Sequence, residues 1–205
     1  MASIEDLKRQ ALQGDEESQY LLGMEYMGRG DYVNAVEWLE KIVAKLAHSR
    51  YGKAVSNLAQ IHEVGGHPRY SRDQSRDEAI RLFKIIADNP VSVISRLHLG
   101  LLYCEGEGAK HNPVEGKRLI ERSVQEIIDE MKNDEYLKQV ECYRIGIAYF
   151  LGLTNAGNSV SNDDLRKAMD YLGKTVDRCD DRYESDRDLK HKAFKAYKEA
   201  QGRLL

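Results

Sequence analysis

A cysteine and a histidine near the middle of the chain could together supply a nucleophile and its base. They are Cys104 and His111, and a thiol beside an imidazole is the arrangement that cysteine hydrolases use for acyl transfer. Free cysteine, however, more often serves as a small buried apolar side chain. We therefore favour a packing role for Cys104 and keep a small cysteine hydrolase as an alternative.

A run of carboxylates near the C-terminus could hold a divalent cation. Its members are Asp180, Asp181, Glu184, Asp186 and Asp188. The run lacks the glycine and the ligand spacing of a calcium loop, and Arg182 and Arg187 interrupt it. The histidines show no His-x-x-x-His spacing for a metal. We interpret the run as a solvated hinge, keep a metal-dependent hydrolase as an alternative, and expect no cofactor.

Composition narrows the class of partner. A net charge of −3 and a pI near 6.1 argue against nucleic acid, whose binders usually carry a basic stripe. No apolar stretch approaches the ~20 residues that span a bilayer, and residues 1–9 lack the apolar core of a signal peptide. The three cysteines do not resemble a disulfide framework. These features predict a cytoplasmic protein that binds neither nucleic acid nor membrane.

A repeated sequence motif predicts the helices that position these residues. Its strongest copy runs from Leu99 to Gly108, and weaker copies occupy residues 22–30, 58–66 and 145–152. Each copy has an apolar residue, a tiny residue, an aromatic or histidine three positions later, and then glycine. Self-similarity at roughly 35 to 50 residues is typical of a solenoid built from helix pairs.

Within each unit we expect two helices that cross closely. In the first unit Gly23 and Ala35 have little or no side chain, so the two backbones can approach there, while Tyr26 and Trp38 fill the space on either side. The second helices are expected at residues 35–41, 79–84, 116–122 and 168–174.

Start signals support these helices. Ser75 with Glu78 fits a capping box, and Asn112-Pro113 fits a cap followed by proline at the first helical position.

Helices are also expected at both ends, where a solenoid needs caps. Residues 3–13 predict a short helix with Ser3 as its N-cap. Its apolar side is formed by Ile4, Leu7, Ala11 and Leu12. Residues 185–205 predict a charged helix that buries Leu189, Ala193, Phe194 and Tyr197. We favour a capping role for this last helix over an arm that joins a neighbouring molecule.

The repeated motif resembles the Sel-one-like repeat (SLR) family, a longer-looped relative of the tetratricopeptide repeat. The resemblance covers roughly residues 15–180 in four units, with its best first helix in 95–108 and its best second helix in 34–42. Ala59 and His62 depart from the family's glycine and tyrosine, and Gly116 stands where alanine is usual.

The fold expected from these observations is all-α. It is a right-handed α-solenoid of about four helix pairs within one domain, residues 1–205. A capping helix occupies 1–14, the repeats 15–180 and a final helix 181–205.

The first helices of such solenoids line the concave wall, where partners usually bind. In the present repeat this wall is expected to carry apolar and aromatic side chains that suit a peptide or helix. The candidate contact residues are Tyr20, Met24, Met27, Gln60, Glu63, Leu97, Leu101, Tyr143, Ile147 and Phe150. The alternative is that the same side chains form core, packed against neighbouring first helices or against the C-terminal helix.

The resemblance implies an adaptor without catalytic activity, whose partner is a peptide, loop or helix of another protein. Two other non-enzymatic roles stay open. One is an inhibitor or immunity protein that blocks a single toxin or enzyme. The other is self-association, for which the C-terminal helix offers a route to a homo-oligomer.

Overall fold

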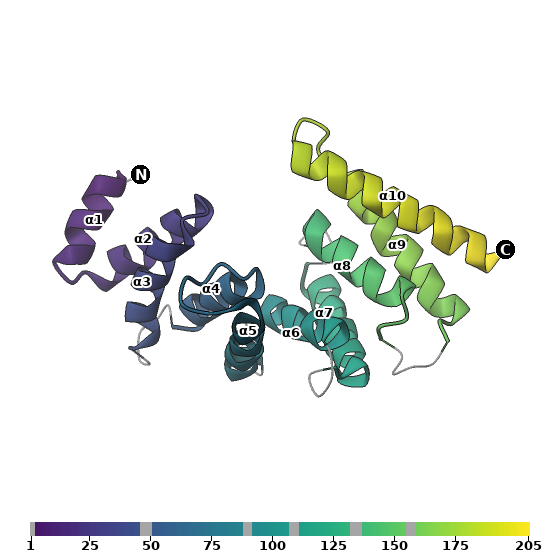
Figure 1. Cartoon of the computed structure of the whole chain (residues 1–205), viewed down its shortest axis with the longest axis horizontal. Helices are drawn as coiled ribbons and strands as arrows, with labels where there is room; N and C mark the ends of the chain where they lie inside the picture. The colour runs from purple at the N-terminus through teal and green to yellow at the C-terminus, as the bar shows by residue number, and fades with distance from the viewer. Residues whose placement is uncertain (1–2, 46–50, 88–91, 107–110, 132–136, 155–158) are drawn as a thin grey trace. The chain divides into compact units, whose positions relative to one another are not determined.

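The fold is all-α. A computed structural model of the 205-residue chain describes residues 3–45, 51–87, 92–106, 111–131, 137–154 and 159–205. Over these ranges the chain forms ten α-helices and no β-strand (Figure 1). In chain order they are α1 Ile4–Leu12, α2 Glu16–Gly28, α3 Tyr32–Val43, α4 Tyr51–Glu63, α5 Arg72–Ala87, α6 Val93–Glu105, α7 Pro113–Met131, α8 Gln139–Phe150, α9 Asn162–Arg178 and α10 Glu184–Leu204. The expected all-α solenoid of helix pairs is confirmed. Within the same ranges no helix is both long and apolar enough to cross a lipid bilayer.

The chain divides into two compact units. Unit 1 is Met1–Ser95 and unit 2 is Arg96–Leu205. Unit 1 contains α1 to α5, and unit 2 contains most of α6 together with α7 to α10. In each repeat pair we call the earlier helix the first helix (α2, α4, α6, α8) and the later one the second helix (α3, α5, α7, α9). The single domain expected over residues 1–205 stays a prediction.

Short polar side chains start the helices where the sequence indicates. The Ser3 hydroxyl accepts a hydrogen bond from the backbone N–H of Asp6 at 3.1 Å. The Asn112 side-chain oxygen accepts one from the N–H of Glu115 at 3.3 Å, directly before Pro113 begins α7. Such caps are worth about 1 kcal/mol each. The predicted caps at Ser3 and Asn112 are confirmed.

The predicted start of the fifth helix is wrong by one turn. The Ser71 hydroxyl accepts from the N–H of Gln74, and the Gln74 side chain accepts from the N–H of Ser71, so these two residues form the capping box. Ser75 lies inside α5 and is fully buried. Glu78 instead pairs with Arg81 one turn later. Two pairs in the sequence fit the capping-box motif, Ser71 with Gln74 and Ser75 with Glu78. The helix begins at the earlier pair.

Close packing within the pairs rests on small residues. In unit 1, a methyl group added at Gly23 of α2 would lie 3.0 Å from the Leu39 side chain of α3. Ala35 is fully buried, as expected at a close crossing. Trp38 packs with Leu22 and Ala11 in the core, and Tyr26 borders that cluster. The predicted role of glycine at the crossing is therefore confirmed in the first repeat.

The crossing of α6 and α7 in unit 2 is closer still. A Cβ added at Gly116 would lie 2.5 Å from Cys104 Sγ and 2.8 Å from the Gly100 carbonyl oxygen. The sulfur of Cys104 thus occupies the volume that an alanine methyl at position 116 would need. This contact explains why the third repeat carries glycine there instead of alanine.

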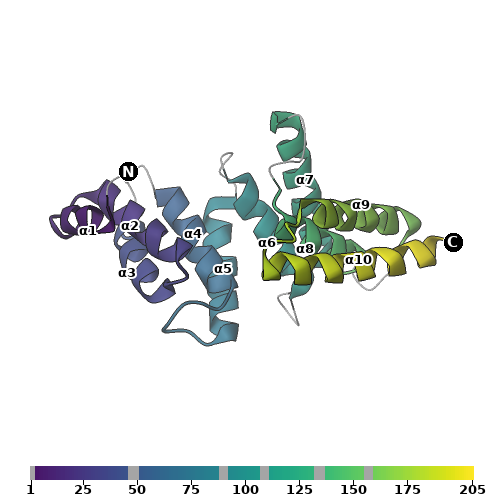
Figure 2. The same ribbon diagram turned by 90° about the horizontal axis from the view of Figure 1, so that it is seen from above.

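The terminal helices pack on their neighbours with small residues. α1 packs on α2, where Ala11 is buried; Leu12, expected on the same face, is 70% exposed, so that expectation is wrong. α10 lies along α9 and also contacts α8 (Figure 2). Its buried residues are Ala193, Ala196 and Ala200. Burial of Ala193 is confirmed, but Phe194 is 50% exposed, because it follows Ala193 by one residue and so points about 100° away from it.

Candidate interaction surface

The unit 1 part of the predicted contact set lies on α2 and α4. Tyr20 is buried, whereas Met24 is partly exposed. The side-chain amide of Asn57 on α4 donates to the Tyr20 hydroxyl and to the Met24 sulfur, which ties both side chains to the neighbouring first helix. The remaining predicted residues of this unit are partly exposed: Met27, Gln60 and Glu63.

Three predicted residues of unit 2 belong to the core. Leu97 and Leu101 are fully buried, and Phe150 is 4% exposed. The reason is that α6 is buried on all sides, with every residue from 95 to 102 buried. A helix that is buried all round has no solvent face. Tyr20, Leu97, Leu101 and Phe150 are therefore buried in this chain, and a part for them in partner binding stays a prediction.

A solvent-exposed apolar stripe does follow α8. Val140 is 50% exposed and Leu151 is 55% exposed, and between them Tyr143 and Ile147 are partly exposed. Their spacing of three, four and four residues places all four on one side of the helix. We call these four residues the α8 stripe. Sequence reasoning found Tyr143 and Ile147 but missed Val140 and Leu151, although the same helical spacing could have found them.

Charged side chains from α6 border the stripe on one side. The Arg144 guanidinium makes two contacts with the Glu105 carboxylate, at 3.0 and 3.1 Å. His98 lies 3.7 Å from Glu141. Burial raises the pKa of the Glu141 carboxyl, but the hydrogen bonds from His98 and the backbone, together with the charges of His98 and Lys138, outweigh this effect, and the net shift is downward. Glu141 therefore stays ionised beside the stripe.

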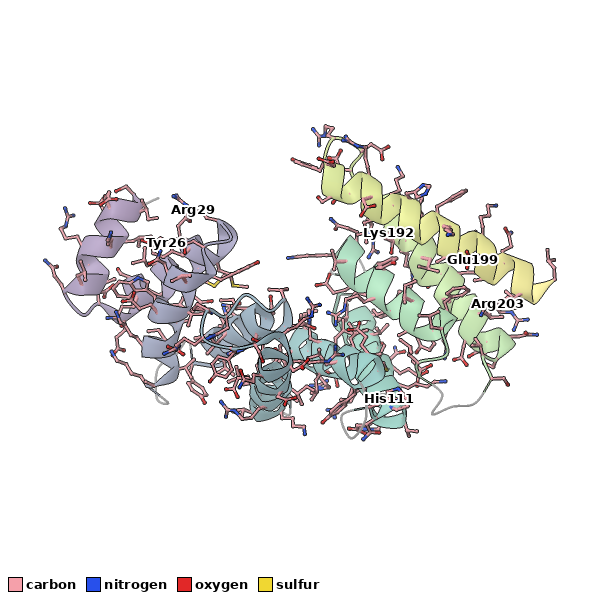
Figure 3. The ribbon with its side chains drawn as sticks, in the orientation of Figure 1. Tyr26, Arg29, His111, Lys192, Glu199 and Arg203 are labelled. Carbon is pink, nitrogen blue, oxygen red and sulfur yellow. The ribbon has the colours of Figure 1, made fainter. Side chains whose placement is uncertain are left out.

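Charged side chains of α10 border the stripe on the other side. Lys192, Glu199 and Arg203 follow one another along this helix (Figure 3). The Arg203 guanidinium lies 4.5 Å from the centre of the Phe150 ring at the end of α8. Lys192 pairs with Asp188 at 2.6 Å. The α8 stripe is thus an apolar strip with charged residues on both sides, an arrangement common at protein interfaces.

A second feature of unit 2 lies between the second helices. It is a hollow of about 340 Å³, which we call the α7–α9 hollow. Its lining residues are Ile120, Glu121, Val124, Gln125, Ile128, Tyr149, Lys167, Asp170 and Tyr171. Sequence reasoning missed it because these residues come from three separate helices, and no spacing within one helix brings them together.

The charged groups of the hollow are paired with one another. The Tyr149 hydroxyl donates to Glu121 at 3.3 Å. The Lys167 ammonium lies 3.0 Å from Glu121 and 3.2 Å from Asp163. Burial lowers the pKa of Lys167, but its hydrogen bonds to the two carboxylates raise it more. The hollow is therefore lined by apolar side chains and by charged side chains that already pair with one another.

Of the two residues that suggested catalysis, one lies in the core and the other on the surface. Cys104 is fully buried, and burial raises the pKa of its thiol to about 12, so it stays protonated at neutral pH. His111 is exposed and lies two residues before α7 begins.

The acidic run pairs with nearby basic residues. Asp180 contacts Arg182, and Asp181 contacts Lys190. In the ranges that the structure describes, no group of three or more histidine, cysteine or acidic side chains is arranged to hold a metal ion.

Comparison with protein-family models places a Sel1 repeat at residues 16–44, 52–90, 94–125 and 142–177. These stretches fall on the four helix pairs α2–α3, α4–α5, α6–α7 and α8–α9. Comparison with curated protein sequences gives no match. Among solved structures, the chain is similar to a protective antigen of uropathogenic Escherichia coli strains that displays an SLR fold, with 20% identity and a TM-score of 0.47. The match covers 100% of this chain and 51% of the antigen, so this chain spans about half its length.

Proposed function

The chain belongs to the Sel1 repeat family, and from this premise we propose that it is a non-enzymatic adaptor that binds another protein through the α8 stripe. Sel1 repeats generally mediate protein–protein interaction and form a non-catalytic type of scaffold. The partner segment proposed is a peptide, loop or helix that lies along α8.

The observation that carries this proposal is the exposure of four aligned apolar side chains on a first helix. Val140 and Leu151 leave half or more of their surface in water. Monomeric proteins seldom expose aligned apolar residues without a partner for them. The charged residues of α6 and α10 on either side would fix the orientation of the bound segment. Met24, Met27, Gln60 and Glu63 stay in the proposed contact set because they are partly exposed.

The test is affinity capture from the native lysate with wild type and a Leu151→Glu variant. Leu151 is 55% exposed, so a charge there leaves the core intact. We expect the captured partner to be lost or its affinity to fall at least tenfold. The new carboxylate would lose its water in the apolar contact and find no positive partner there, which weakens binding. Circular dichroism verifies that the variant is folded.

Two matched variants make the result specific. Val114→Glu changes an apolar residue of similar exposure (65%) on α7 and is expected to retain the partner. Ile128→Glu places the same charge in the α7–α9 hollow. If a folded Leu151→Glu protein keeps the partner while Ile128→Glu loses it, the proposed surface is wrong and binding belongs to the hollow.

A further inference from the structure

Two buried histidines of unit 1 stack on each other. His62, near the end of α4, and His67, in the loop that follows, have ring centres 4.3 Å apart and planes inclined by 13°. They are only 2% and 3% exposed. Tyr70 meets both rings edge-on, with centre distances of 4.9 and 4.6 Å. Two parallel imidazoles and one aromatic edge thus form a compact cluster between α4 and its loop.

The hydrogen bonds of the cluster suit neutral rings. The backbone N–H of Arg69 donates to Nδ1 of His67 at 3.3 Å, so that nitrogen carries no proton. The proton of a neutral His67 then sits on Nε2, which faces a Glu40 carboxylate oxygen at 3.6 Å. Among the described residues, Nδ1 of His62 has no hydrogen-bond partner. A second proton on either ring would therefore find no acceptor placed for it or would disrupt the bond from Arg69.

The loop that carries His67 is fitted onto α3. Gly66 lies so close to Tyr32 that a Cβ there would be 2.4 Å from the Tyr32 ring. Gly65 turns the chain with a φ of +72°, which glycine adopts without strain. The guanidinium of Arg69 pairs with Glu40 of α3. The histidine stack holds residues 64–71 on α4, while the contacts of Gly66 with Tyr32 and of Arg69 with Glu40 hold them against α3.

The charged groups around the stack do not compensate two positive rings. Glu40 faces it from α3, Glu78 and Arg81 face it from α5, and Arg69 with Tyr70 lie in the loop itself. Each carboxylate is already paired with an arginine, Glu40 with Arg69 and Glu78 with Arg81. Burial is the main cause that lowers the pKa of His62 to about 4 and also lowers that of His67. Acidification therefore favours any state in which the rings reach water.

We propose that the stacked His62–His67 pair is an acid-sensitive latch, which holds loop 64–71 closed on α4 and beside α3 while both rings are neutral and releases it when they take up protons. The latch lies wholly in unit 1 and is independent of the α8 stripe. It gives the long loop between α4 and α5 a defined role as the element that moves.

Amide hydrogen exchange of residues 64–71, corrected for intrinsic rates, tests the latch at pH 7.5 and pH 5.0. Opening raises the His62 pKa from about 4 to the ordinary 6.5, so we expect protection to fall by at least about tenfold at pH 5.0. His62→Phe keeps an aromatic ring that cannot be protonated, and it should lose most of this pH dependence. His191→Gln, an exposed histidine on α10, should behave like wild type.

The proposal is overturned if wild-type protection is the same at both pH values or if folded His62→Phe keeps the full pH effect. Nuclear magnetic resonance titration of the wild-type imidazoles gives a test that does not depend on a variant. The latch requires His62 to stay neutral well below pH 6.5 in the closed state. Ordinary titration of both rings near pH 6.5 with the loop still protected would also refute it.

Discussion

At the residue scale, single glycines decide how closely the helices and the latch loop can pack. Gly66 is the clearest case, because an added methyl would overlap the Tyr32 ring at 2.4 Å. We expect Gly66→Ala to lower the free energy of unfolding by about 1–3 kcal/mol, as overpacking generally does. Urea unfolding followed by circular dichroism measures the change. Gly52→Ala, also in unit 1, has nothing within 4 Å of its added methyl and should be neutral or slightly stabilising.

A second residue pair tests the packing at the α6–α7 crossing. Gly116→Ala should be destabilising because its methyl meets the sulfur of Cys104 at 2.5 Å. Removing that sulfur in a Cys104→Ala/Gly116→Ala double variant should recover part of the loss, and a double-mutant cycle measures the coupling. Recovery cannot be complete, since the Gly100 carbonyl oxygen still lies 2.8 Å from the new methyl. Strictly additive effects would mean that Cys104 does not determine the glycine at position 116.

At the element scale, α10 depends on small residues for its close contact with α8 and α9. Ala193 and Ala200 are fully buried, so a larger side chain would push the helix outward. We expect Ala193→Leu to cost about 1–3 kcal/mol of stability and to lower the thermal midpoint in a melting curve. Lys195→Leu, an exposed position on the same helix, should leave the midpoint nearly unchanged. Equal effects of the two substitutions would contradict close packing of α10 at Ala193.

At the element scale, the sequence predicts how helices begin and cross, but it does not predict which helix is buried all round. Caps at Ser3 and Asn112, and the glycine crossing at Gly23, depend on local chemistry, and the sequence predicts them correctly. Leu97 and Leu101 show the opposite case. The buried residues of α6 include polar as well as apolar side chains, so its periodicity indicates no unique face, and only the tertiary structure shows that the helix is buried.

The α7–α9 hollow marks a further limit of sequence reasoning. Tyr149 and Lys167 meet Glu121 across three helices, and no spacing within one helix encodes that meeting. The α8 stripe lies between these extremes. Its four members share one helical face, so their alignment could be predicted from helical periodicity. Their exposure to solvent could not, because it depends on where α6 and α10 lie beside α8.

At the scale of the whole molecule, the two compact units separate the two proposals. The α8 stripe and its charged borders lie in unit 2, and the histidine latch lies in unit 1. A fragment of residues 92–205 keeps all of α6 to α10, including the Gly100–Gly116 crossing and the Arg144–Glu105 pair. We therefore expect this fragment to fold, to show a helical circular dichroism spectrum, and to bind the same partner as the full chain. Because it lacks His62 and His67, any pH dependence that the latch gives to the full chain should be absent from the fragment. A folded fragment that fails to bind would show that the partner also needs first-helix residues of unit 1, with Met24 and Gln60 the residues to change next.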